Sequence, residues 1–233
     1  MPTPTALVTG ASRGLGRALA TALSERGWRL VLDGRDPARL TAAAAALPHP
    51  ELVTAVAGDV ADSQHRAALA RAVGHRLDLL VNNASDLGPS PLPPLAELDP
   101  DEFRGVLTVN AVAPLGLVQA VLPALRSAHG TILNISSDAA VEAYAGWGGY
   151  GASKAALDQL TAVLAVEHPE LRVYAVDPGD MATDMHQAAF PGEDISDRPA
   201  PETVVPALFS LLDGDRPSGR YRAAELIPAG TAR

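Results

Sequence analysis

Short apolar runs, each bounded by Gly, Asp or Asn, recur along the chain with helix-length stretches between them. The runs lie at residues 6–9, 30–32, 53–57, 77–81, 131–135 and 173–176. They are nearly continuous rather than alternating, which is typical of strands buried on both faces of a parallel sheet. The stretches between them, such as 16–26, 37–47 and 63–73, carry apolar residues at helical spacing. This alternation predicts right-handed βαβ units and therefore a doubly wound α/β sheet.

The length of the chain favours one domain. At 233 residues it is longer than the commonest domain, yet one α/β domain of this size can close around one core. Two Pro-rich segments, 88–95 and 191–201, lie too near the middle of a strand–helix repeat to be linkers, so we expect surface loops. We predict a single domain over residues 1–233: a Rossmann-like doubly wound parallel sheet flanked by helices on both faces, with ligands beyond the strands' carboxyl ends.

Composition narrows the class of partner. Hydrophobic residues make up 47% and charged residues 19% of the chain, which is ample for a packed interior. A net charge of -9 without clustered Lys or Arg disfavours nucleic acid and anionic membranes as partners. There is no cysteine, and the histidines lack ligand spacing, so we expect no metal site. Neither a secretory signal nor about 20 consecutive apolar residues for a membrane span is expected, which favours a cytoplasmic enzyme acting on small molecules.

A glycine-rich turn follows the first predicted strand and runs straight into a helix. It reads Thr-Gly-Ala-Ser-Arg-Gly-Leu-Gly over residues 9–16. Glycines permit backbone conformations closed to other residues, and a helix N-terminus attracts anions such as a pyrophosphate. The alternative is a strand-to-helix turn without a ligand. The cofactor contacts predicted here are Gly10, Ser12, Arg13, Gly14, Leu15 and Gly16.

A tyrosine and a lysine four residues apart indicate acid–base chemistry. Lys154 is the only lysine, whereas arginine occurs seventeen times, which suggests a place where a compact ammonium is needed. Tyr150 and Lys154 would share one helix face, and the positive charge would lower the tyrosine pKa from about 10 towards the working pH. Alone, such a pair is often an ordinary helix surface pair. Ser137, thirteen residues before Tyr150 at the end of a strand, makes the pattern more specific.

Together these motifs resemble the short-chain dehydrogenase/reductase family, whose TGxxxGxG turn and YxxxK pair they match. The resemblance covers residues 9–183 and implies hydride transfer between a nicotinamide cofactor and a carbonyl or secondary alcohol. It assigns Tyr150 as the general acid/base, Ser137 to the substrate oxygen, and Lys154 to the tyrosine pKa and the ribose hydroxyls. Asn110, in the helix after the fourth strand, would seat a water that feeds protons to Lys154. These four residues are the predicted catalytic set.

Other family landmarks appear in order. The resemblance places Asp59 and Val60 at the adenine, Asn83 and Ala84 beside the cofactor, and Pro178, Gly179 and Thr183 at the nicotinamide carboxamide and phosphate. Tyr150 and Lys154 complete the predicted cofactor contacts. One departure is Ser85, where the family usually has glycine, which puts the shape of the substrate pocket in doubt. The alternative for Asn82 and Asn83 is that they only satisfy backbone groups.

The end of the second strand bears on the choice of cofactor. An acidic residue at this strand end accepts a bond from the ribose 2′-OH of NAD, whereas a nearby arginine accommodates the 2′-phosphate of NADP. The sequence here is Asp33-Gly34-Arg35, and by family spacing the NAD-selecting acid would fall at Gly34. Strand alternation should turn Asp33 to the other face. Arg35, with Arg13 as a second base, favours NADP(H), and Asp33 keeps NAD(H) as the alternative.

Three further expectations concern the cover of the site, assembly and rival functions. Residues 181–199, within a lid at about 180–200, should be mobile without ligand, and His186 in this segment is a candidate substrate contact. Family resemblance implies a homodimer or homotetramer through the long helices near 107–125 and 151–166. Two rival functions are a dinucleotide-binding sensor or scaffold of the same fold without turnover, and an epimerase or dehydratase using bound nicotinamide.

Overall fold

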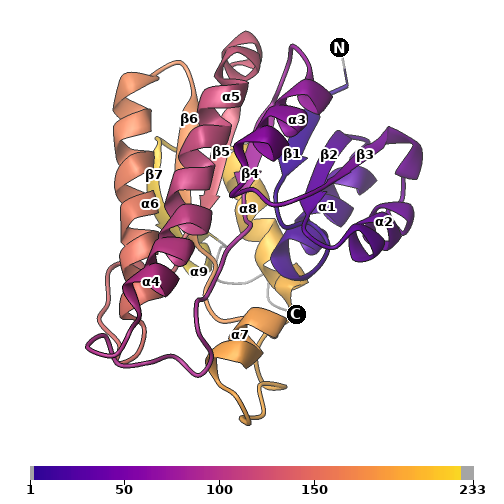
Figure 1. Cartoon of the computed structure of the whole chain (residues 1–233). Helices are drawn as coiled ribbons and strands as arrows, with labels where there is room; N and C mark the ends of the chain where they lie inside the picture. The colour runs from indigo at the N-terminus through magenta and orange to yellow at the C-terminus, as the bar shows by residue number, and fades with distance from the viewer. Residues whose placement is uncertain (1–2, 227–233) are drawn as a thin grey trace.

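The computed structural model describes residues 3–226, and these contain one seven-stranded sheet (Figure 1). The strand order is β3-β2-β1-β4-β5-β6-β7, and every neighbouring pair is parallel. The strands are β1 (Thr5–Val8), β2 (Arg29–Gly34), β3 (Val53–Ala57), β4 (Leu79–Asn82), β5 (Thr131–Ile135), β6 (Arg172–Asp177) and β7 (Gly219–Arg222). The order reverses between β1 and β4, which is where a doubly wound sheet opens a crevice for ligands. The predicted fold class is therefore confirmed.

Helices cover both faces of this sheet (Figure 1). They are α1 (Gly14–Glu25), α2 (Pro37–Ala45), α3 (Ser63–Val73), α4 (Pro100–Leu107), α5 (Ala113–Ala128), α6 (Gly148–Glu167), α7 (Asp184–Ala189), α8 (Val205–Leu212) and α9 (Ala223–Leu226). Successive strand residues point to opposite faces. Ala6 and Val8 of β1 therefore pack in the core under α1 and α8, whereas Leu7 between them packs under α3 and α5.

Local sequence explains where three of the helices begin. Asp36, Asp62 and Asp99 each accept a hydrogen bond from a backbone N–H in the first turn of α2, α3 and α4. Such N-caps satisfy amides that have no partner within the helix. Pro37 and Pro100 occupy the first helical position of α2 and α4, where a missing N–H costs nothing. These starts fix the loops that border the crevice.

One helical run is longer and more apolar than the sequence suggested. A π-helical segment, Thr108–Val112, joins α4 to α5, so that Pro100–Ala128 is continuous. By length and composition alone this run could cross a membrane, with a mean hydropathy of 1.8 in its most apolar window, contrary to the expectation that no segment comes near that length. In this structure Leu117, Val121 and Leu125 of α5 are buried against the sheet, beside α3. The run is therefore a core helix of this fold.

Candidate functional site

A cleft of about 1000 Å³ lies at the carboxyl ends of the parallel strands. Its lining combines the glycine-rich turn, the ends of β2, β5 and β6, the start of α6, and the segment around α7. Of the predicted site residues, Gly10, Ser12, Arg13, Gly14, Leu15, Arg35, Asp59, Val60, Asn83, Ala84, Ser137, Tyr150, Lys154, Pro178, Gly179 and Thr183 line this cleft. Gly16 and Asn110 lie behind its wall. Residues taken from seven separate stretches of the chain are thus brought together.

The glycine-rich turn has the backbone form of an anion cradle. Gly10 and Gly14 have φ values of +64° and +54°, which side chains disfavour. A Cβ on Gly16 would lie 2.5 Å from the Gly10 carbonyl oxygen, so only glycine allows α1 to start this close to the turn. No side chain among residues 3–226 caps α1, which leaves its first amides available. This geometry fits a pyrophosphate.

Thr9 and Asn83 hold that turn against the end of β4. The Thr9 hydroxyl accepts from the backbone N–H groups of Asn83 and Ala84, both at 3.0 Å. The Asn83 side chain donates to the carbonyl oxygens of Thr9 at 2.9 Å and Gly10 at 3.2 Å. The Asn83 amide therefore satisfies backbone groups, as its alternative interpretation proposed. Through these bonds, Asn83 holds the glycine-rich turn in place beside the cleft.

The end of β2 contains a buried acid and an exposed base. Asp33 is 2% exposed, and its carboxylate accepts from the Gly10 N–H at 3.2 Å and lies 2.6 Å from Nε2 of His65. Arg35 is exposed at the cleft edge, and its guanidinium has no hydrogen-bond partner within residues 3–226. Arg17 and Arg39, which the sequence analysis did not single out, line the same end of the cleft. The carboxylates of Glu25, Asp36 and Asp59 line it too, and Asp36 pairs with Arg39 at 3.6 Å, so this end carries charges of both signs.

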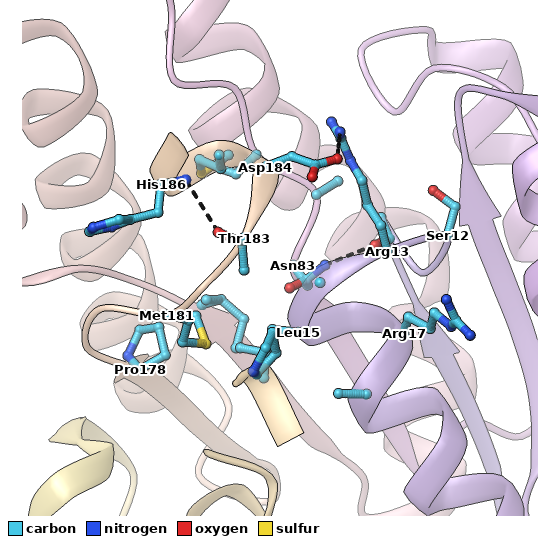
Figure 2. A pocket seen from close by; sticks show the side chains of 18 of the residues that line it. Ser12, Arg13, Leu15, Arg17, Asn83, Pro178, Met181, Thr183, Asp184 and His186 are labelled. Atoms are coloured by element: carbon cyan, nitrogen blue, oxygen red, sulfur yellow. Dashed lines mark hydrogen bonds and ion pairs between the residues drawn. The ribbon is translucent and has the colours of Figure 1, made fainter. Parts of the chain in front are cut away.

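Arg13 lies elsewhere than beside Arg35. Its guanidinium forms an ion pair with Asp184, the first residue of α7, and Figure 2 shows the two side chains pointing toward one another. Both side chains remain more than half exposed. Ser12 and Arg17 lie on the other side of the turn in the same view. In this structure Arg13 therefore joins the glycine-rich turn to the lid segment.

Tyr150 and Lys154 form the inner wall of the cleft from the first turns of α6. Tyr150 is 8% exposed and packs edge-on against Trp147, with ring centroids 5.7 Å apart. Lys154 is 2% exposed, and its Nζ donates to the carbonyl oxygen of Ile135 at 2.7 Å. That ammonium lies 5.5 Å from the centroid of the Tyr150 ring. The pair shares one face, as predicted, but the ammonium points to the end of β5.

Burial, rather than the charge of Lys154, has the largest effect on the pKa of Tyr150. Burial raises the pKa of Tyr150 to about 12; hydrogen bonding to Ser85 and Ser137 lowers it, and the Asp138 and Asp177 charges raise it. Burial likewise lowers the pKa of Lys154 to about 8, against the opposing charge of Asp158. The expected lowering of the tyrosine pKa by Lys154 is therefore not what this structure shows. Removing a phenol from water disfavours the phenolate more than the nearby groups favour it.

Asn110 lies in the π-helical segment, with all four hydrogen-bonding positions of its side-chain amide in use. Its Oδ1 accepts from the Ser85 hydroxyl at 3.2 Å and the Asp86 N–H at 2.7 Å. Its Nδ2 donates to the Asp86 carbonyl oxygen at 2.8 Å and the Ser153 hydroxyl at 2.9 Å. A water held by this residue would therefore have to bind its backbone carbonyl. The side chain joins the loop after β4 to α6.

A second buried chain of polar groups fixes the same helix. The Asn82 amide donates to Asn134 at 2.8 Å, and the Asn134 amide donates to Thr161 at 2.8 Å. These bonds link β4 and β5 to α6, on which Tyr150 and Lys154 lie. Buried hydrogen-bonded networks of this kind hold one arrangement of the groups they join.

Ser137 has a neighbour that the sequence analysis did not single out. The Ser137 hydroxyl donates to the Asp138 carboxylate at 2.9 Å and accepts from the Ala139 N–H at 3.2 Å. Arg220 of β7 donates to the Ser137 carbonyl oxygen at 2.9 Å and to Asp158 at 2.8 Å. The serine is therefore held through its backbone, while its hydroxyl lies within reach of both Asp138 and Tyr150.

The far end of the cleft is apolar and aromatic. Trp147 and Phe190 have ring centroids 5.9 Å apart, and His186 lies 4.9 Å from Phe190. Leu87 and Met185 pack in the same cluster. His186 also lies 3.8 Å from the Asp180 carboxylate and lines the cleft. A substrate beside Tyr150 would therefore lie near Trp147, Met185 and His186, which line the cleft, with Phe190 packed behind them.

Known proteins match the chain over most of its length. The family described as short chain dehydrogenase matches residues 4–194. The uncharacterized oxidoreductase YciK of Escherichia coli is 33% identical over 221 residues, which are 90% of this chain and 86% of that protein. Sepiapterin reductase of Meriones unguiculatus is 37% identical over 199 residues, 78% of this chain and 76% of the relative.

A solved structure agrees with this fold. A Shigella flexneri short chain dehydrogenase, complexed with NADP, has a TM-score of 0.85 and 32% identity and covers 95% of this chain and 97% of its own. The family match spans both the glycine-rich turn and the Tyr150–Lys154 helix. The chain is therefore an oxidoreductase that belongs to the short-chain dehydrogenase family.

Proposed function

We propose that the chain is an NADP(H)-dependent reductase of small carbonyl compounds, with Tyr150 as the proton donor. The observation that carries this proposal is the meeting of two groups of residues in one cleft. The buried wall of Ser137, Tyr150 and Lys154 faces an apolar end, and the glycine-rich turn with its arginines forms the other end. That division separates a reacting oxygen from the charged half of a dinucleotide.

The residues present fit a nicotinamide dinucleotide. The open amides of the turn suit the pyrophosphate, Arg35 suits a 2′-phosphate, and Lys154 suits the ribose hydroxyls. When bound, the dinucleotide supplies the hydride. The Shigella flexneri relative complexed with NADP supports the same choice. The protein's own part is to orient the two reactants and to move the proton.

The pKa values of Tyr150 and Lys154 are consistent with reduction of a carbonyl substrate. With a pKa of about 12, the Tyr150 phenol stays protonated at neutral pH and can give its proton to the alkoxide oxygen that develops on the substrate. Ser137 can donate to the same oxygen once its hydroxyl turns from Asp138. Lys154, with a pKa near 8, can exchange a proton close to neutral pH and return one towards the tyrosine.

Turnover is the first test. Mixing the protein with NADPH and a panel of aldehydes and ketones should give a stoichiometric fall in absorbance at the reduced-nicotinamide band. A sensor or scaffold would bind NADPH without that fall, and an epimerase or dehydratase would convert substrate with no net oxidation of the cofactor. Either result would contradict the proposed reductase.

The choice of cofactor is tested at Arg35. Charge-assisted hydrogen bonds contribute roughly 1.5–3 kcal/mol, so Arg35→Ala should weaken NADPH binding by about 10- to 150-fold and NADH binding little. Arg216→Ala, an exposed arginine away from the cleft lining, is a matched control. Equal losses for the two cofactors, or a wild-type preference for NADH, would refute the choice of NADP(H).

We also propose a homo-oligomer. Three large apolar side chains on the two predicted interface helices are exposed: Val112 beside α5, and Val163 and Val166 on α6, the last 81% exposed. Exposed apolar surface of this kind is typical of association. Light scattering should give a dimer or tetramer for the wild type, and Val166→Glu should shift the mass towards the monomer. A monomeric wild type at micromolar concentration would contradict this proposal.

A further inference from the structure

A buried acid–imidazole pair lies directly beside the end of the cleft assigned to the cofactor's adenosine. Asp33 and His65 are 2% and 8% exposed, and their Oδ1 and Nε2 atoms are 2.6 Å apart. The other carboxylate oxygen accepts the Gly10 N–H at 3.2 Å. The Asp33 carbonyl oxygen also accepts from the Ala11 N–H at 2.8 Å. The first contact joins α3 to β2, and the other two join β2 to the start of the glycine-rich turn.

Gly58, which follows β3, leaves the space that the His65 imidazole occupies. A Cβ on Gly58 would lie 2.2 Å from Nδ1 of His65, far inside contact distance. Gly58 has no positive φ that would require glycine on conformational grounds. The absence of its side chain therefore serves the imidazole. Three residues from β2, the end of β3 and α3 thus fit together around one carboxylate.

The position of the acid gives the pair its chemical meaning. A carboxylate at the end of the second strand accepts a hydrogen bond from a ribose 2′-OH and repels a 2′-phosphate. Here both oxygens of Asp33 are engaged, one by the Gly10 amide and one by His65. Strand alternation turns Asp33 to the face opposite Gly34, and these two contacts hold its carboxylate there instead of at the ribose.

We infer that His65 is a specificity-determining residue, because it holds Asp33 away from the cofactor and lets the site beside Arg35 accept a 2′-phosphate. This inference rests on the proposed NADP(H) dependence. It assigns His65 a role in selecting the ligand and none in turnover. Asp33 then serves as a positioning residue for the Gly10 amide.

Binding of two half-ligands tests this without any catalysis. ADP-ribose and ADP-ribose 2′-phosphate differ only in the 2′-phosphate, and their dissociation constants can be measured by calorimetry. His65→Phe, which fills the space of the imidazole, should lower the preference for the phosphorylated ligand by about tenfold or more, the effect of one uncompensated buried charge nearby. ADP-ribose itself should bind as well as before or better.

Two further variants separate charge from structure. Asp33→Asn/His65→Phe should restore the wild-type preference, because the asparagine can still accept the Gly10 N–H and carries no charge. If His65→Phe does not fold, Gly58→Ala displaces the imidazole by direct contact and should lower the preference in the same way. Restoration by the double variant is the result that a merely structural role would not give.

The outcomes distinguish the inference about His65 from the proposed NADP(H) dependence on which it rests. Equal losses of both half-ligands in His65→Phe, or an unchanged preference, would overturn the role of His65 while leaving NADP(H) dependence intact. A wild-type protein that prefers ADP-ribose would overturn both. A lowered preference in His65→Phe that returns in the double variant supports the inference.

Discussion

Two sides of the cleft are built by different physical means. The catalytic wall, made of the ends of β4 and β5 and the start of α6, is joined by buried hydrogen bonds through Asn82, Asn110 and Asn134. The polar contacts of the lid, residues 180–200, include two exposed ones, the ion pair of Asp184 with Arg13 and the bond from Ser90 to the carbonyl oxygen of Ala188, while its apolar side packs in the cluster around Tyr150.

The difference follows from what each side must do. Buried polar networks resist rearrangement because an unpaired group in a low-dielectric interior is costly. Exposed ion pairs contribute about 0–1 kcal/mol each and exchange readily with water. The groups proposed to move a proton are therefore fixed, whereas opening the proposed lid would break only weak polar contacts besides its apolar packing. Changes to each side should have effects of very different size.

The largest effect is expected from Tyr150→Phe. In the proposed reaction the phenol supplies the proton, whereas the ring packs against Trp147, so turnover should fall by about 10²–10⁴-fold while dinucleotide affinity changes little. Steady-state rates and cofactor titration measure the two effects. Tyr144→Phe is the matched control: Tyr144 does not line the cleft and its exposed hydroxyl bonds Glu142 and Asp138, so most of the activity should remain. Tyr150→Phe retaining more than about a tenth of wild-type kcat would exclude it as proton donor.

The next effect is the pH dependence of stability at Lys154. Its pKa falls from 10.5 to about 8 on folding, so between these values the folded chain binds fewer protons than the unfolded chain. Stability therefore rises with pH across this window and is lowest below pH 8, by about 3 kcal/mol at 1.36 kcal/mol per pKa unit. Lys154→Met should lack this rise.

Urea unfolding of both proteins across this window measures the effect as a difference. The wild type should gain stability relative to Lys154→Met as pH rises from about 8 to 10. The raised pKa of Tyr150 acts on both proteins in the opposite sense above pH 10 and cancels in that comparison. Parallel curves would mean that Lys154 is not desolvated as the structure indicates.

A third effect, on stability, is expected at Asn110. Asn110→Ala removes the partners of the Asp86 amide and carbonyl and of Ser153, and should cost about 1–3 kcal/mol in the free energy of unfolding. Asn110→Asp keeps the acceptor but loses both donors, so its loss should show whether the donated bonds matter. Gln119→Ala, at an exposed position of α5, is the control. An Asn110→Ala protein as stable as that control would show that the network carries no stability.

The comparison also shows which features can be predicted from sequence. Six strands are predictable because each is a local run of apolar residues, and the glycine-rich turn is predictable because its backbone demands local residue types. Strand β7, Gly219–Arg222, carries arginines and is only half-buried, so nothing local marks it. Its pairing with β6 at the edge of the sheet makes it a strand.

Contacts between distant segments account for the rest. The tyrosine pKa cannot be predicted from the spacing of Tyr150 and Lys154, because burial by the surrounding fold outweighs the charge. In the sequence His65 is one of several scattered histidines, and its contact with Asp33 becomes visible only in the fold, where β2 and α3 lie side by side. Arg13 likewise meets Asp184, 171 residues later in the chain, only across the folded cleft. Sequence motifs therefore predict which residues line the cleft, whereas the packing of distant segments determines their hydrogen-bond and ion-pair partners.

The smallest effect should come from the lid. Asp184→Asn breaks the ion pair with Arg13, which is exposed on both sides, so the free energy of unfolding should change by less than about 1 kcal/mol. Opening of the lid should nevertheless become easier, because this ion pair is a polar contact that joins the lid to the glycine-rich turn. Cleavage within residues 181–199 by a broad-specificity protease should therefore be faster in Asp184→Asn than in the wild type.

The control for this prediction is Asp101→Asn, which removes a local exposed ion pair with Arg104 on α4, outside the lid. It should leave the rate of cleavage in the lid unchanged. Saturating cofactor and substrate should slow cleavage of the wild type and narrow its difference from Asp184→Asn, because a closed lid excludes protease as it excludes water. Cleavage equally fast with and without these ligands would mean that residues 181–199 form a static loop. The proposed difference between a fixed catalytic wall and a lid that opens would then be wrong for the lid.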